Sequence, residues 1–77
     1  MSTMVKTVNK FFKTAIKSEV DEVKSKILLS ERQEDIFERY YIKKQDVNFI
    51  ADTLNICPIV VSNELRLIRF KLMKILD

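Results

Sequence analysis

Few side chains in this 77-residue chain could do covalent or acid–base chemistry. The sequence has no histidine and one cysteine, Cys57, so it lacks the usual ligand sets for zinc, a histidine general base and an intramolecular disulfide. Glycine is also absent, and phosphate-binding loops of the Walker or Rossmann kind need glycine in their tight turns. We therefore expect no enzyme, with no catalytic residue, no metal site and no cofactor.

Lysine gives the N-terminal part of the chain its positive charge. Residues 1–28 contain six lysines and three acidic residues, a net charge of +3, whereas eight basic and eight acidic residues cancel over 29–77. At 100° per residue, four lysines form one stripe of a helix: Lys6, Lys10, Lys13 and Lys17. The opposite side is apolar and contains Met4, Val8, Phe11, Phe12 and Ala15. Such a basic amphipathic helix fits a solvated helix face, an arm that follows DNA phosphates or an anionic membrane surface.

The composition as a whole favours helices. Glycine is absent, proline occurs once, and good helix formers run from end to end. Valine and isoleucine recur every three or four residues more often than in alternation, and tight-turn dipeptides such as Asn-Gly are missing. We expect an all-α fold: a small helical bundle with a C-terminal helix-turn-helix and an N-terminal amphipathic helical extension.

The apolar seam of the N-terminal segment drifts around the helix after Ile16. Ser18, followed by Asp21 and Glu22, resembles an N-cap with acidic residues in the first turn. We expect helices over about 4–17 and 19–28, or a single curved helix. The seam itself contains Val5, Val8, Phe12, Ala15 or Ile16, Val20, Val23 and Ile27.

Cellular location and assembly follow from what the sequence lacks. No apolar run approaches the roughly 20 residues that a bilayer-spanning helix needs, and no stretch resembles a signal peptide. We expect a cytoplasmic protein with no membrane span, and the single thiol is consistent with that compartment. Because so short a chain buries little surface, we expect additional burial from dense helix packing, a homodimer or a partner protein.

Four local signals divide the second half. Ser30 with Gln33 forms a capping box, and the helix that follows has the core stripe Ile36, Phe37, Tyr40 and Tyr41 until the polar Lys43-Lys44-Gln45. Asp46 can cap a short helix over 47–54. Asn55 is suited to the left-handed conformation that ends a helix, and Pro58 suits the first turn of a helix over 58–75.

This order of short helix, tight turn and second helix is the layout of a helix-turn-helix. Ala51, in the middle of the first helix, is small enough for the two helices to cross closely. The wedge between them would contain Ile50, Leu54, Ile56, Val61 and Leu65. Cys57 is expected to be a small buried hydrophobe, and the aromatic residues are expected in the core: Phe11, Phe12, Phe37, Tyr40, Tyr41, Phe49 and Phe70.

From Leu29 to about residue 74 the chain resembles region 4 of bacterial sigma factors, and it is also similar to the C-terminal DNA-binding domain of LuxR-type regulators. The residues that carry the resemblance are Leu29-Ser30-Glu31-Arg32-Gln33, Tyr40-Tyr41, Phe49-Ile50-Ala51, Leu54-Asn55-Ile56 and Val61. Cys57 departs from the family pattern, which usually has a serine or threonine cap there, and Ile59 and Val60 replace polar or basic residues. No part of the chain resembles the other sigma regions, so we do not expect a complete sigma factor.

The resemblance implies that the second helix of the motif enters the major groove of double-stranded DNA. The residues that match its base-contacting face are Ile59, Val60, Ser62, Asn63 and Arg66. An asparagine can bond adenine bidentately and an arginine can do the same to guanine. Contacts to the DNA backbone are expected from Arg32, Gln33, Lys43, Lys44, Arg69 and the stripe Lys6, Lys10, Lys13 and Lys17.

We expect two parts: a basic amphipathic segment over 1–28 for dimerisation or phosphate contact, and a sigma region 4-like domain over 29–77. The expected function is sequence-specific DNA binding in transcription regulation. The alternative is a protein-interaction module that docks on RNA polymerase, a sigma factor or a second copy of the chain.

Overall fold

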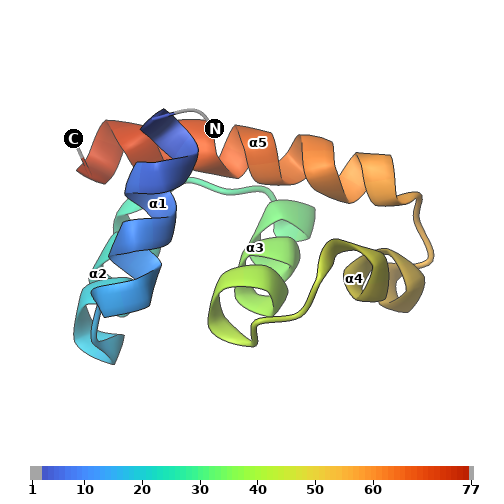
Figure 1. Cartoon of the computed structure of the whole chain (residues 1–77), viewed down its shortest axis with the longest axis horizontal. Coiled ribbons are helices and arrows are strands. Elements are labelled where there is room, and N and C mark those ends of the chain that lie inside the picture. The colour runs from blue at the N-terminus through green and yellow to red at the C-terminus, as the bar shows by residue number, and fades with distance from the viewer. Residues whose placement is uncertain (1–2, 77) are drawn as a thin grey trace. The chain divides into compact units, whose positions relative to one another are not determined.

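The computed structural model describes residues 3–76, with side chains from Val5 onward, and every regular element in that range is helical (Figure 1). The elements are α1 (Thr3–Thr14), α2 (Lys17–Lys26), α3 (Glu31–Phe37), the π-helix η1 (Glu38–Ile42), α4 (Val47–Leu54) and α5 (Pro58–Leu76). The all-α prediction is confirmed over these residues, which contain no strand. None of their helices is both long and apolar enough to cross a bilayer.

The N-terminal segment forms two helices, and the break lies earlier than predicted. Helix α1 ends at Thr14, and α2 begins at Lys17, so Ser18 lies inside α2 and the prediction that it is the N-cap is wrong. Ile16 occupies the cap position instead, with the Glu19 carboxylate accepting its backbone N–H at 3.1 Å. Ile16 is also 63% exposed, so it does not belong to the apolar seam.

The chain packs as two compact units. The first, which we call the terminal unit, combines the residues up to Leu28 with those from Arg69 onward; the second, the central unit, is Leu29–Ile68. The terminal unit buries apolar side chains from α1, from α2 and its C-cap residue, and from the last turns of α5: Val8, Phe12, Val23, Ile27 and Leu72. The central unit has its own buried set: Ile36, Phe37, Tyr41, Ile50, Ala51, Val61, Leu65 and Ile68.

The predicted capping box at Ser30 is confirmed. The Ser30 hydroxyl accepts the backbone N–H of Gln33 at 3.2 Å, and Gln33 Oε1 accepts the backbone N–H of Ser30 at 3.1 Å. These two bonds satisfy donors that a helix start leaves unpaired, which fixes the beginning of α3.

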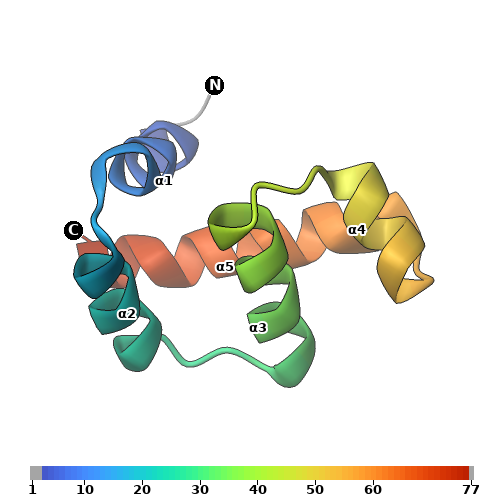
Figure 2. The same cartoon turned by 90° about the horizontal axis from the view of Figure 1, so that it is seen from below.

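The end of this helix differs from the sequence expectation, because it widens into the π-helix η1. The backbone N–H of Lys43 bonds the carbonyl of Glu38, five residues back, at 3.0 Å. Lys44 then takes a left-handed conformation with φ 60°, and Gln45 N–H bonds the carbonyl of Arg39 at 2.9 Å. Figure 2 shows the chain passing from α3 through this end and an extended connection to α4.

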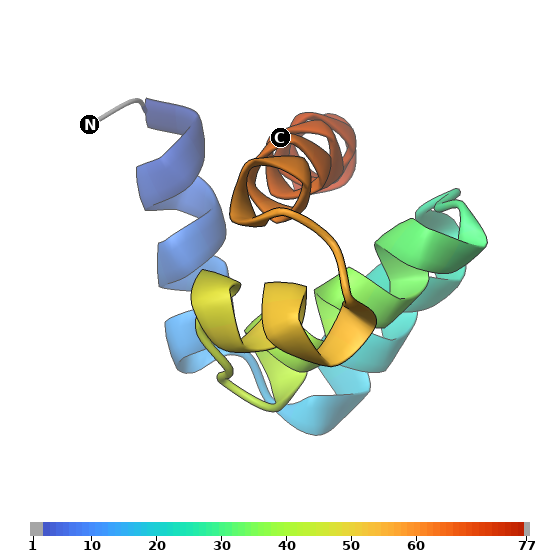
Figure 3. The same ribbon diagram turned by 90° about the vertical axis from the view of Figure 1, so that its right-hand side faces the viewer.

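Both boundaries of the turn between α4 and α5 follow the local signals. Asp46 accepts the backbone N–H of Phe49 at 2.8 Å and so caps α4. Asn55 ends α4 with φ 57° and ψ 47°, the predicted left-handed conformation, and Pro58 begins α5. In Figure 3, α4 lies across the view while the first turns of α5 are seen nearly along their axis.

Three burial predictions in this region and beyond are wrong. Phe49 is 49% exposed and Phe70 is 57% exposed, so neither is a core residue. Cys57, expected to be a buried hydrophobe, is exposed in the turn before Pro58. Periodicity placed the two phenylalanines on apolar stripes, but the neighbouring elements cover other residues of those helices.

Candidate nucleic-acid interface

The first turns of α5 separate a buried side from an exposed side. Val61, Leu65 and Ile68 are almost fully buried and hold the helix in the central unit. Four of the predicted base-contacting residues are exposed: Ile59, which is 68% exposed, with Ser62, Asn63 and Arg66. Val60 is half-buried. The exposed residues follow the three- and four-residue spacing that places side chains on one helix face.

The polar groups on this face are available to an external partner. Across residues 5–76, the side chains of Ser62, Asn63 and Arg66 take part in no hydrogen bond or ion pair. An amide, a guanidinium and a hydroxyl can each bond base edges in the major groove. Glu64, the acidic residue of these turns, is half-buried.

Three of the predicted backbone-contacting residues are exposed cations of the central unit: Arg32, in the first turn of α3, and Lys43 and Lys44, which follow η1. Gln33 is different, because it is only 6% exposed and its side chain completes the Ser30 capping box. We therefore leave Gln33 out of the proposed interface.

The remaining predicted backbone contacts belong to the terminal unit. Lys6, Lys10 and Lys13 are exposed on α1, while Lys17 is exposed at the first position of α2. The break between the helices therefore reduces the predicted stripe of four to a row of three. Arg69 is half-buried, and its Nε is buried without a hydrogen-bond partner among the described residues.

Apolar residues missed by the sequence reasoning also lie on exposed surface of the central unit. Leu67 is 50% exposed directly after Arg66, and Ile42 is 42% exposed at the end of η1. A sequence signal for Leu67 exists: Val61, Leu65 and Ile68 already form a complete seam at spacings of four and three. Leu67 falls outside that seam.

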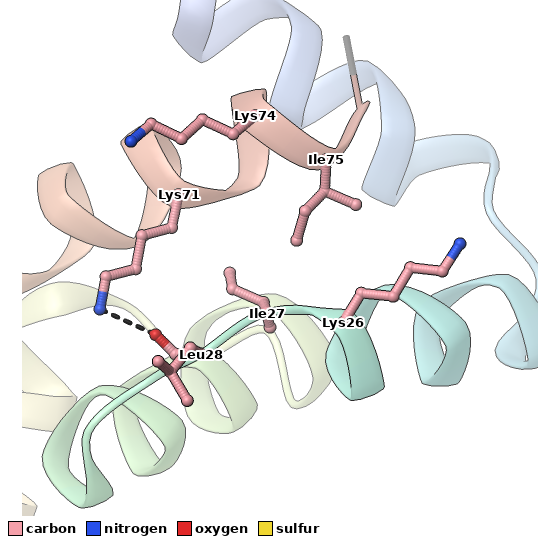
Figure 4. Close-up of a pocket in the computed structure, with 6 residues that line it drawn as sticks. All are labelled: Lys26, Ile27, Leu28, Lys71, Lys74 and Ile75. Atoms are coloured by element: carbon pink, nitrogen blue, oxygen red, sulfur yellow. Dashed lines mark hydrogen bonds between the residues drawn. The ribbon is translucent and has the colours of Figure 1, made fainter.

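Two other kinds of site find no support among the described residues. No group of three or more potential metal ligands occurs within them. A shallow hollow in the terminal unit is lined by Lys26, Ile27, Leu28, Lys71, Lys74 and Ile75 (Figure 4). Its three ammonium groups point in different directions, with Lys71 Nζ donating to the carbonyl of Leu28 at 2.8 Å and Lys26 Nζ pairing with Glu22 at 2.9 Å. They do not converge on a place where an anion could bind.

Comparison with known proteins finds no matching family model, no matching curated protein and no matching solved structure.

Proposed function

We propose that this protein is a sequence-specific DNA-binding transcription regulator, in which α4, the turn at Asn55 and α5 act as a helix-turn-helix of the sigma region 4 type. One observation carries the proposal. Ser62, Asn63 and Arg66 are exposed and make no side-chain hydrogen bond or ion pair across residues 5–76, while the other side of the same helix is buried in the central unit. A recognition helix needs this combination, because it must be held rigidly and still present side chains to the major groove.

Residue chemistry assigns separate tasks along this face. Arg66 would contact guanine and Asn63 adenine, since these pairs allow two hydrogen bonds each. Ile59, at the start of the helix, would contact thymine methyl groups, with Val60 beside it in the sequence. Arg32, Lys43 and Lys44 would contact phosphates, which position the protein but carry no sequence information.

A selection from random duplex DNA, followed by binding measurements on the enriched site, tests the proposal. Arg66→Ala should weaken binding to that site by roughly 5- to 150-fold, the equivalent of about 1–3 kcal/mol for a bidentate base contact. It should also relax the preference at one base position. Asn63→Ala should relax the preference at another.

Arg32→Ala is the matched control, since it removes an exposed arginine from the same unit. It should weaken binding to selected and random duplexes by similar factors, as expected for a phosphate contact. If no sequence is enriched, or if Arg66→Ala and Arg32→Ala change the sequence preference equally little, then α5 is not a recognition helix.

The exposed apolar side chains favour a second candidate, a protein-docking surface. Ile59 and Leu67 are 68% and 50% exposed on the same helix, and apolar anchors of this kind are typical of helix-in-groove contacts. RNA polymerase, a sigma factor or a second copy of this chain would be the partner. Such a contact should depend little on salt and should be lost in Ile59→Asn, whereas DNA binding must weaken steeply as salt increases.

A further inference from the structure

The division into two units concentrates the positive charge in a way that the linear sequence does not show. Over residues 3–28 and 69–76 the terminal unit has nine basic and three acidic residues, a net charge of +6. The central unit has five basic and seven acidic residues, a net charge of −2. The unit that contains the proposed recognition face therefore has no net positive charge to attract phosphate.

Within the terminal unit, α1 is the helix with uncompensated charge. It has three lysines and no acidic residue, whereas α2 has three lysines and three acidic residues. Lys6, Lys10 and Lys13 are exposed at spacings of four and three residues, so they share one face. Across residues 5–76 none of the three is engaged in an ion pair.

We infer that Lys6, Lys10 and Lys13, the α1 lysine row, form a sequence-independent binding site for the phosphate backbone of duplex DNA. The dimensions of the row suit this partner. Lys6 and Lys13 are seven residues apart, about 10 Å along a helix axis. One DNA strand has a phosphate about every 3.4 Å of duplex axis, so the row can face about three phosphates.

The structure argues against a membrane surface as the partner of α1. Interfacial helices insert their apolar face into the lipid, but the apolar residues opposite the row are already packed inside the terminal unit. Val8 is fully buried and Phe12 is only 9% exposed, with the ring of Phe11 5.1 Å from that of Phe12 in an edge-to-face contact. The face of α1 that remains accessible to a partner is therefore the positively charged one.

Because Val8 and Phe12 of α1 are buried, the lysine row must be tested without removing the helix. Deleting α1 would remove core residues, so the lysines should instead be changed to glutamine, which has a similar helix propensity. The variant is Lys6→Gln/Lys10→Gln/Lys13→Gln, and the probe is a duplex of random sequence titrated at several salt concentrations. Circular dichroism and a thermal melt establish that the variant is folded.

The matched control is Lys17→Gln/Lys24→Gln/Lys26→Gln, which removes all three lysines of α2 from the same unit and changes the net charge equally. Each lost phosphate contact should reduce the slope of log affinity against log salt by about 0.9, so the α1 variant should lose about 2.7. Over a fourfold increase in salt the wild type would then lose about 40-fold more affinity than the α1 variant. The α2 variant should change the slope by less than about one.

The outcomes separate this inference from the proposed function. Steep salt dependence that the α1 variant alone removes supports the lysine row, even if no DNA sequence is preferred over another. An unchanged slope in the α1 variant, or equal losses in the α1 and α2 variants, overturns the row as a DNA site and leaves the proposed recognition by α5 untouched. Binding to phosphatidylserine vesicles that the α1 variant loses, with binding to the duplex unaffected, assigns the row to membranes and also overturns the inference.

Discussion

Asn55 offers the sharpest test of the turn that connects α4 to α5. Its backbone lies at φ 57° and ψ 47°, a conformation in which a Cβ atom crowds the following carbonyl. The N–H groups of Asn55 and Ile56 both bond back to the end of α4, at 3.2 Å to Asp52 and 3.0 Å to Ala51. Backbone hydrogen bonds therefore hold the geometry of the turn. The type of side chain at position 55 determines the conformational free energy that this geometry requires.

Replacing Asn55 by alanine should destabilise the central unit by about 1 kcal/mol, since alanine lacks the local hydrogen bonding that lets asparagine adopt this conformation. Asn55→Gly should be close to neutral, because glycine enters the left-handed region without steric cost. For a chain of this size, 1 kcal/mol corresponds to a decrease in Tm of roughly 4–8 °C.

Urea unfolding followed by tyrosine fluorescence suits the measurement. The two tyrosines, Tyr40 and Tyr41, are both in η1 of the central unit, and the chain has no tryptophan to mask them. Equal stabilities for Asn55→Ala and the wild type would refute the argument, as would a loss in Asn55→Gly as large as that in Asn55→Ala. The first result would mean that the turn tolerates a second backbone geometry, and the second would mean that the left-handed φ does not set the preference at position 55.

The same method checks two further predictions. Lys44 also lies at positive φ, so Lys44→Gly should match or exceed the wild type in stability, and a clear loss would mean that its side chain has a structural role. Ile50 is fully buried, so Ile50→Ala should cost about 2–5 kcal/mol. Phe49→Ala, at a side chain that is 49% exposed, should cost clearly less, and similar losses at the two positions would contradict the burial pattern.

Those parts of the fold that depend on local chemistry could be predicted from the sequence. Ser30, Asp46, Asn55 and Pro58 each determine a helix end through bonds or dihedral preferences within a few residues. Such signals are short-range, so one sequence contains all the information that they need.

The remaining features follow from no short-range rule that can be applied to the sequence. The break at Ile16 follows from the Glu19 carboxylate bonding the backbone N–H of Ile16, although isoleucine is a poor cap by composition. The π-helix after Phe37 inserts an additional residue into the turn, which no periodicity of side chains announces. Phe49 is exposed because α4 is anchored through Ile50 and Ala51 instead.

The candidate site likewise has one feature that could be predicted from the sequence and one that could not. The exposure of Ser62, Asn63 and Arg66 could be expected from the positions between the buried residues of α5. The concentration of charge in the terminal unit could not, because residues 69–76 add their three cations to α1 and α2 only through the fold. If the linear sequence is divided at residue 28, Arg69, Lys71 and Lys74 belong to the C-terminal part and not to the part that contains α1 and α2.

The exposed sulfur of Cys57 has a practical consequence. Because it is the sole thiol of the chain and lies one residue before Pro58, a maleimide dye would attach at a single defined place. Quenching or energy transfer between that dye and a labelled oligonucleotide would then report whether a duplex approaches the start of α5, without adding any new cysteine to the protein.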